Sequence, residues 1–319
     1  MSALGFAIPS KGRLKEQTEA FLVDCGFGVR QIGGERAYQA ELSGAGQVQL
    51  QLLSAREIAE RLIDGSLQVG VTGQDLLEEI SPNLGNDAAI LDGLGFGGAR
   101  VVVAVPTSWI DVDTMADLDR AAESFRARHG RRLVVATKFQ NLSRRFFARH
   151  GFSAYRLVDS AGATEAAPAT GAADLIVDIT TTGATLKANH LKILDDGEML
   201  ASEASLVVSL RADWTGEQKA VLEGLLRRID ARRNARATAR IETGRVPDAA
   251  TRESAASSCG LRPASAEPGR SFLCPQAQVH AAAALLEAAG CGPVAVSASD
   301  FLYEGDGLLV ERAKSALGQ

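Results

Sequence analysis

Short apolar runs rich in β-branched residues alternate with helical patterns up to about residue 210, and this alternation constrains the fold more than any other feature. One example is the helical pattern 55–66, which lies between the strand-like runs 48–54 and 67–73. Three later runs are apolar almost throughout, as expected for strands buried on both faces: 99–106, 132–138 and 173–180. Such an order predicts an α/β fold with a parallel or mixed sheet covered by helices.

The pattern changes after about residue 210. Residues 213–234 carry apolar side chains at helical spacing, among them Leu222, Leu225 and Ile229, and predict an amphipathic connecting helix. Beyond it the elements follow in the order β-α-β-β-α-β, which predicts a separate ferredoxin-like domain over 235–319. Its expected elements are strand 235–242, helix 247–260, strands 261–267 and 269–275, helix 278–290 and strand 292–304.

Composition and charge exclude several classes of protein. The chain has 319 residues and a net charge of −5, whereas a nucleic-acid-binding domain usually carries a basic excess. The four cysteines are widely spread and the four histidines have no i, i+4 pair, so neither a disulfide framework nor a protein-built metal site is expected. Charges near the N-terminus and the lack of a long apolar run predict a cytoplasmic protein without membrane or nucleic-acid partners.

The segment DLIVDITTTGATL, 174–186, carries the strongest chemical signal. Asp174 and Asp178 lie four residues apart, so an extended strand would place both carboxylates on one face. The following Thr180–Gly183 loop and the start of a helix offer amides and hydroxyls to an anion such as a phosphate. A carboxylate beside such a loop suits the two hydroxyls of a ribose. The alternative is an ordinary strand–turn–helix junction in which Asp178 caps the helix.

A wider comparison of motifs adds a family to this interpretation. The segment EAAPATGAADLIVDITTTGATL, 165–186, closely resembles the motif of the long-form ATP phosphoribosyltransferases, the first enzymes of histidine biosynthesis. Four further segments resemble the family in the same order along the chain: 8–14, 67–79, 99–106 and 135–147. The resemblance covers about residues 4–210, and the C-terminal domain is similar more loosely, through element order and AAGCGPVAVSASDFLYE.

The resemblance implies a fold and a reaction. The expected catalytic core has the two-lobed architecture of type II periplasmic binding proteins, with lobe I formed by 1–97 and 186–212 and lobe II by 98–185. The expected reaction transfers the phosphoribosyl group of phosphoribosyl diphosphate to N1 of ATP, giving phosphoribosyl-ATP and diphosphate. Two alternatives stay open: a two-lobed small-molecule-binding protein, and a phosphoribosyltransferase with another purine acceptor.

The resemblance also assigns site residues. Lys11, Arg13 and Asp178 are the expected catalytic residues. The phosphoribosyl diphosphate site is expected to use Asp174, Asp178, Thr180, Thr181, Thr182, Gly183, Ala184 and Thr185. Candidates for ATP or its polyphosphate are Gly12, Arg56, Asp75 and Arg144, of which Arg56 could be merely solvated and Asp75 merely a helix cap. Magnesium is expected to arrive with the substrate phosphates, and no protein side chain is assigned to it.

Assembly and regulation are expected from the same resemblance. The long form implies a homo-oligomer, with a hexamer expected, and histidine as an effector. A regulatory partner subunit, as in the short form, is an open alternative. The chain departs from the family at Glu57, Ala59 and Gln140, and LRPASAEP replaces a serine-proline-threonine run in the C-terminal domain. The last departure leaves feedback by histidine open.

Overall fold

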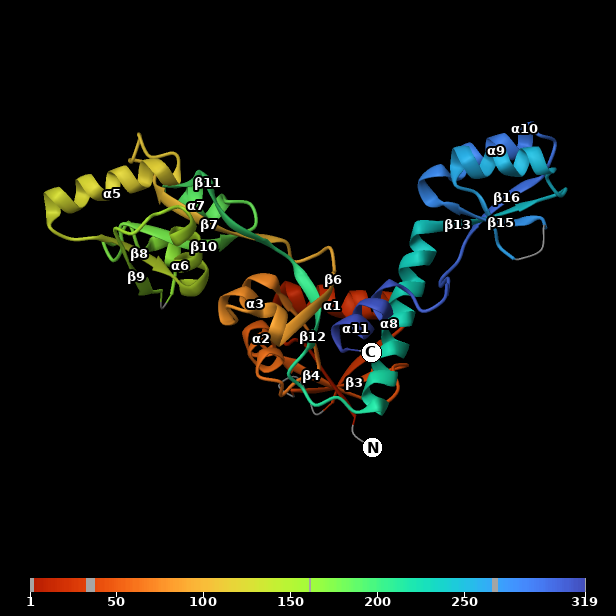
Figure 1. The fold of residues 1–319 in the computed structure, drawn as a ribbon, viewed down its shortest axis with the longest axis horizontal. Helices are drawn as coiled ribbons and strands as arrows, with labels where there is room; N and C mark the ends of the chain where they lie inside the picture. Colours follow the sequence, from red (N-terminus) through yellow and green to blue (C-terminus); the bar gives the residue numbers. More distant parts are fainter. Residues whose placement is uncertain (1–2, 33–37, 161, 266–268, 319) are drawn as a thin grey trace.

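The computed structural model describes residues 3–32, 38–160, 162–265 and 269–318. Figure 1 shows three bodies in a row, with lobe II at one end, lobe I in the middle and the C-terminal sheet at the other end. The long helix α8, Gly216–Ala237, runs from lobe I to the C-terminal sheet. The expected α/β class, with a two-lobed core of the type II periplasmic-binding-protein kind and an added C-terminal domain, is confirmed.

Lobe I is built on a seven-stranded sheet in the order β2-β3-β4-β1-β5-β12-β6. Its central strands β4, β1 and β5 are parallel, whereas β12 is antiparallel to both of its neighbours. The strands are β1 Leu4–Pro9, β2 Gly28–Ile32, β3 Gln39–Ser43, β4 Val48–Leu53, β5 Val69–Gly73, β6 Ala88–Gly93 and β12 Ala204–Ser209. The helices are α1 Gly12–Asp24, α2 Ala55–Ile63, α3 Gln74–Ile80 and α4 Leu84–Asp87.

Alternation along the central strands supplies two cores, one on each face of the sheet. Phe6 and Ile8 of β1 pack with α1 and α8 on one face. Ala7 faces the other side, where Ile58 and Leu62 of α2 cover the sheet. Because helices cover both faces, the sequence of β1 is apolar throughout rather than alternating.

Lobe II is built on a five-stranded sheet in the order β11-β7-β10-β8-β9. Its middle strand β10 is antiparallel to β7 and parallel to β8, which in turn is parallel to β9. The strands are β7 Ala99–Pro106, β8 Leu133–Thr137, β9 Tyr155–Asp159, β10 Leu175–Thr180 and β11 Leu191–Ser202. The helices are α5 Met115–His129, α6 Gln140–Arg149, the 3-10 turn η1 Thr164–Ala166 and α7 Ala184–Ala188.

The second boundary between the lobes lies later than the sequence predicts. The sequence predicts that lobe I resumes at residue 186, but β11 pairs with β7 from Leu191 to Ser202 and belongs to the sheet of lobe II. The chain returns to lobe I only at Glu203, just before β12. The charged stretch 195–198 interrupts the apolar pattern of β11, and the strand is irregular there, which hides its continuity in the sequence.

The C-terminal domain has the predicted β-α-β-β-α-β order. Its four-stranded antiparallel sheet runs β14-β15-β13-β16, the ferredoxin-like arrangement. The expected strand 261–267 is reduced to two residues, and 266–267 lie outside the described residues. The elements are β13 Thr238–Thr243, α9 Ala249–Cys259, β14 Arg262–Pro263, β15 Ser271–Pro275, the 3-10 turn η2 Gln276–Gln278, α10 Val279–Ala288 and β16 Val294–Ala298.

The last helix, α11 Leu308–Ala316, leaves this domain, contrary to the expected unit 235–319. Leu309 and Val310 are buried in the core of lobe I, and the amide of Leu309 donates to Asp230 of α8 at 2.8 Å. Figure 1 shows α11 beside α8 and β6, far from α9 and α10. Its apolar face therefore stabilises lobe I. Among the helices described, none is both long and apolar enough to cross a bilayer.

Candidate active site

A pocket of about 300 Å³ opens where β10 ends. The carboxyl ends of the parallel strands β8, β9 and β10 meet at this edge of the sheet, which is where ligands bind in open α/β sheets. Most of the predicted phosphoribosyl residues gather here. The pocket is lined by Glu165, Asp178, Ile179, Thr180, Thr181, Thr182, Thr185 and Leu186.

The threonine loop is held in shape by its own side chains. The hydroxyl of Thr180 accepts a hydrogen bond from the amide of Gly183 at 2.9 Å, and the hydroxyl of Thr182 accepts from Ala184 at 3.3 Å. Gly183 has φ +76°, a left-handed conformation that favours glycine. These hydrogen bonds hold the turn between β10 and α7, so the hydroxyls of the loop lie around the same pocket.

Asp178 lies at the edge of this loop, directly after the fully buried residues Leu175–Val177 of β10. Val177 is fully buried, whereas Asp178 is half-buried and its Oδ1 accepts from the amide of Ile179 at 2.8 Å. Burial raises the pKa of this carboxyl and the charge of Glu165 raises it further, whereas the hydrogen bond from the Ile179 amide and the charge of Lys138 act in the opposite direction. A carboxylate with a raised pKa in a pocket of polar side chains is a candidate for a functional site.

Glu165 and Lys138 are two charged residues near Asp178 to which the sequence motifs give no role. Glu165 lies on η1, in the connection that leaves the end of β9, and Lys138 directly follows β8. Both strands end at the same edge of the sheet as β10, so the topology brings these charges to Asp178. The signal that could have found them is the rule that residues following adjacent parallel strands converge.

Asp174 lies outside this pocket, which corrects the expectation that it contacts the ribose. Its two carboxylate oxygens accept from Arg131 at 2.6 and 2.9 Å, and Oδ2 also accepts from the amide of Val134 at 2.7 Å. Although burial opposes ionisation, Arg131 and the Val134 amide hold the pKa of this carboxyl below its ordinary value. Asp174 therefore fastens the start of β10 to the neighbouring β8.

The predicted residues of lobe I cluster at one edge of its own sheet. Lys11, Gly12 and Arg13 follow β1, and Arg56 follows β4, so all lie at carboxyl ends of parallel strands. They are exposed, and Arg56 forms an ion pair with Glu60 at 2.9 Å. Within the residues that line the Asp178 pocket, none comes from lobe I.

Asp75, which follows β5, is engaged structurally. Its carboxylate accepts from the hydroxyl of Ser202 at 2.6 Å, and its amide donates to the same Ser202 oxygen at 3.1 Å. Burial raises the pKa of Asp75, which is only 7% exposed. The bonds join α3 to the end of β11, where the chain returns to lobe I, so the geometry favours a structural role over a contact with nucleotide.

The two adjacent arginines of α6 point in different directions, as their helical spacing predicts. Arg144 is exposed and donates to the side chains of Gln140 and Asn141. Arg145 instead donates to the backbone carbonyl of Glu78 in lobe I at 2.6 Å. Arg144 is therefore the member of the pair that a ligand could reach.

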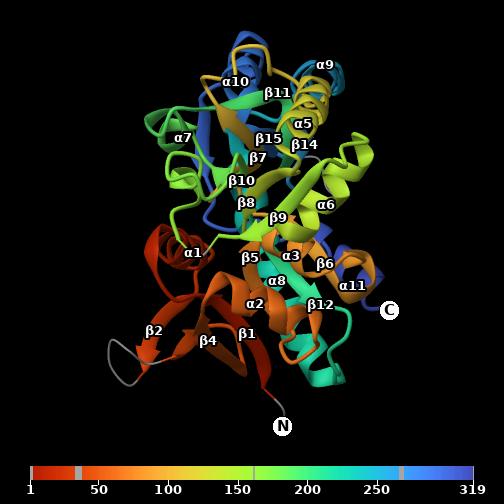
Figure 2. The ribbon, with the colours of Figure 1, turned by 90° about the vertical axis from the view of Figure 1, so that its left-hand side faces the viewer.

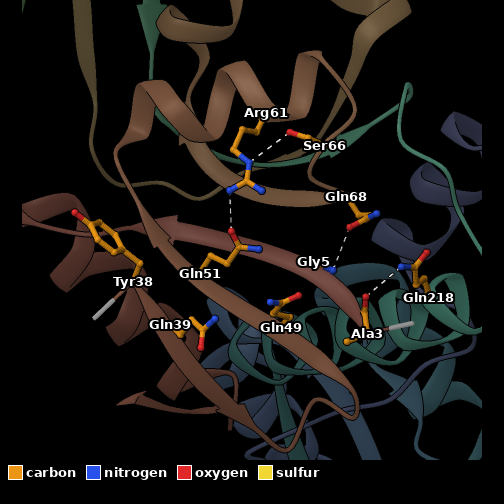
Figure 3. A pocket seen from close by; sticks show the side chains of 10 residues that line it. All are labelled: Ala3, Gly5, Tyr38, Gln39, Gln49, Gln51, Arg61, Ser66, Gln68 and Gln218. Carbon is orange, nitrogen blue, oxygen red and sulfur yellow. Dashed lines mark hydrogen bonds between the residues drawn. The ribbon is translucent and has the colours of Figure 1, made fainter. Parts of the chain in front are cut away.

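A larger cavity of about 520 Å³ lies elsewhere on lobe I and is drawn in Figure 3. Figure 3 shows glutamine side chains over one face of the sheet, with Arg61 donating to Gln51 at 2.8 Å. Gly5 and Gln68 place it near the amino ends of β1 and β5. Because α/β sheets bind ligands at the carboxyl ends of their strands, this cavity is not the candidate site despite its size.

Comparisons with known proteins identify the family of the chain. The family model described as ATP phosphoribosyltransferase matches residues 54–231, more than half of the chain. An ATP phosphoribosyltransferase of Caulobacter vibrioides is 49% identical, over 98% of this chain and 97% of its own. That of Afipia carboxidovorans is 46% identical, over 98% of both chains.

A solved structure is also similar. The ATP phosphoribosyl transferase (HisG:HisZ) complex from Thermotoga maritima contains a chain that superposes with a TM-score of 0.53 at 25% identity, over 71% of this chain and 95% of that one. The sequence resemblance is thus confirmed over nearly the full length. The chain belongs to the ATP phosphoribosyltransferase family, the enzymes of the first step of histidine biosynthesis.

Proposed function

We propose that the pocket at the end of β10 holds the phosphoribosyl group of phosphoribosyl diphosphate. The carboxylate of Asp178 accepts hydrogen bonds from the ribose 2- and 3-hydroxyls, and the loop 180–185 binds the 5-phosphate through amides and hydroxyls. The observation that carries this proposal is that Asp178 and the threonine loop line one pocket. A capping role for Asp178 has less support, since its carboxylate accepts from the amide of Ile179 rather than from an amide of α7.

The reaction joins N1 of the ATP adenine to C1 of the ribose and breaks the bond between C1 and the diphosphate oxygen. Positive charge develops on the sugar as diphosphate leaves, and the anionic Asp178 stabilises this charge. Stabilisation by preorganised charged groups is usually the largest single contribution to catalysis in such a site. Lys11 and Arg13, with Gly12 between them, follow β1 as exposed groups that suit the departing diphosphate. Arg56 and Arg144 remain candidates for the polyphosphate of ATP.

The carboxylates at the wall of this pocket suit a magnesium ion. Asp178 and Glu165 place two carboxylates at its wall, and oxygen ligands of this kind are what Mg²⁺ prefers, together with substrate phosphates and water. Mg²⁺ carried by the phosphates would neutralise charge on the leaving diphosphate. Across the described ranges, no three histidine, cysteine or acidic side chains gather into a protein-built metal cluster.

The pKa of Asp178 leads to a prediction about pH. Only the ionised carboxylate accepts from both hydroxyls, so kcat/KM for phosphoribosyl diphosphate falls as pH drops through the pKa of Asp178, which lies above the ordinary value of about 3.9. Glu165→Gln removes the neighbouring negative charge and lowers that pKa, so the acid limb of the profile moves to lower pH. Glu123→Gln, on the exposed surface of α5, should leave the limb in place. A limb that stays fixed or moves to higher pH in Glu165→Gln would contradict the assignment.

We further propose a self-sufficient long-form enzyme of the cytoplasm that assembles as a homo-oligomer, expected to be a hexamer. The C-terminal ferredoxin-like domain supports this form, and histidine is its expected effector. Purified protein mixed with ATP, phosphoribosyl diphosphate and Mg²⁺ should by itself change the adenine absorbance, and added histidine should slow the change. Activity that appears only with a regulatory partner subunit would refute self-sufficiency, and rates unaffected by histidine would refute the effector.

A further inference from the structure

The two lobes touch through a polar contact between α3 and α6. Figure 2 shows these helices next to one another, with α3 in lobe I and α6 in lobe II. The chain crosses between the lobes at 94–98 and again at Glu203. The lobes are therefore joined in two ways: covalently, through the two crossings of the chain, and non-covalently, through the α3–α6 contact. A substitution can remove the non-covalent contact.

Glu79 of α3 is at the centre of this contact. Its carboxylate accepts from the amide of Asn141 at 3.0 Å and from the amide of Leu142 at 2.9 Å. The side chain of Asn141 donates in return to the backbone carbonyl of Glu79 at 2.8 Å. Glu79 is only 6% exposed, so its charge is stabilised chiefly by these donors.

These bonds amount to a helix cap supplied by another lobe. The first amides of a helix lack partners within the helix and carry partial positive charge, which an acceptor or anion stabilises. Phe139, at the N-cap position of α6, offers no side-chain acceptor. By contrast, α5 is capped within lobe II by Thr114 and Asp117. The start of α6 therefore depends on lobe I for a function that helices usually perform locally.

The capped end of α6 lies close to the chemistry. Lys138 is two residues before α6, and its charge acts on Asp178. The same loop follows β8, whose carboxyl end shares an edge with β10. A shift of the start of α6 would therefore move Lys138 relative to Asp178 and would move both relative to lobe I.

We propose that Glu79 is a positioning residue for the transfer reaction. By capping α6 from lobe I, it fixes the phosphoribosyl pocket of lobe II against the Lys11–Arg13 turn and the polyphosphate candidate Arg56, both in lobe I. This role rests on the proposed function of the pocket. Glu79 is not proposed to contact substrate. Its effect is to hold the residues of lobe I and lobe II that form the site in a fixed relative position.

The test compares Glu79→Ala and Glu79→Gln with Thr114→Ala, which removes the local cap of α5. Both alanine variants lose a helix cap and should show similarly lowered Tm values. Only the Glu79 variants should lose at least about tenfold in kcat/KM for ATP, with Glu79→Gln less affected because it keeps one acceptor oxygen. Binding of ribose 5-phosphate, measured by calorimetry without ATP, should change less than about twofold because the residues proposed to hold it are all in lobe II. Loss of alignment between the reacting groups is the physical basis of the expected loss in kcat/KM.

Hydrogen exchange supplies a readout that does not depend on the pocket assignment. The amides of Asn141 and Leu142 should exchange at least about tenfold faster in Glu79→Ala than in wild type, and at the wild-type rate in Thr114→Ala. Faster exchange with unchanged kcat/KM for ATP would reduce Glu79 to a structural cap and overturn the proposal. Unchanged exchange would overturn it as well. Failure of the wild-type protein to bind phosphoribosyl diphosphate would instead refute the proposed function.

Discussion

Asp178→Asn should lower kcat/KM for phosphoribosyl diphosphate by roughly 10²–10⁴-fold while leaving the melting temperature nearly unchanged. A hydrogen bond to a charged group contributes about 1.5–3 kcal/mol, two ribose hydroxyls would lose such bonds, and about 1.4 kcal/mol corresponds to tenfold in rate. Stability should survive because burial already disfavours the charged form of Asp178 and raises its pKa, so a neutral amide of the same shape fits. Steady-state assays and thermal unfolding of the two proteins measure both quantities.

Asp174→Asn is the matched control, because it changes the same residue type only four positions earlier. Asp174 holds Arg131 and the amide of Val134, and its pKa is held below the ordinary value. Its replacement should lower the melting temperature and leave kcat/KM within a few-fold of wild type. Interchanged results, with a slow Asp174 variant and an unstable but active Asp178 variant, would show that the two roles have been exchanged.

Gly183→Val should reduce the affinity for phosphoribosyl diphosphate by at least about 10²-fold, as measured by calorimetry. Gly183 has φ +76° at the start of α7, and holding a β-branched residue there costs on the order of 1–3 kcal/mol. The space itself is not the obstacle, since a Cβ would lie 3.7 Å from Ile193. The loop would instead relax out of the left-handed conformation and carry the hydroxyl contacts of Thr180 and Thr182 away from the pocket.

Gly130→Val separates this effect from strain alone. Gly130 ends α5 with φ +67°, and nothing lies within 4 Å of an added Cβ. Both variants should lose similar stability, but only Gly183→Val should lose binding. If Gly130→Val also lost binding, or if Gly183→Val bound normally, the loop would not be the phosphate site.

Local patterns predicted most elements because their information lies within a few residues. The apolar runs of β1, β8 and β10 and the element order of the C-terminal domain needed no knowledge of distant contacts. Assigning β11 to lobe II and α11 to lobe I, by contrast, required knowledge of contacts between residues far apart in the sequence. Each has an apolar face that could pack on either neighbouring body, and only the folded chain shows which one it covers.

The same distinction applies to the site. That Asp178 and the threonine loop line one pocket was predictable because they are contiguous in the sequence. Glu165 reaches the pocket from a neighbouring connection, and the charge of Lys138 acts on Asp178 from another; a motif read along one strand reveals neither. Asp174 was misassigned because even spacing fixes a face but not a position. Four residues of strand separate it from Asp178 by roughly 13 Å, and Arg131 takes up its carboxylate.

A binding cycle tests the contact between Asp178 and the ribose hydroxyls directly. Calorimetry would compare ribose 5-phosphate with 2-deoxyribose 5-phosphate, on the wild-type protein and on Asp178→Asn. Wild type should bind the ribose compound at least about tenfold more tightly than the deoxy compound. Asp178→Asn should bind the two equally, because the 2-hydroxyl then has no carboxylate partner to lose. Equal discrimination by both proteins would mean that the carboxylate does not hold the sugar, and the assignment of the pocket would fail.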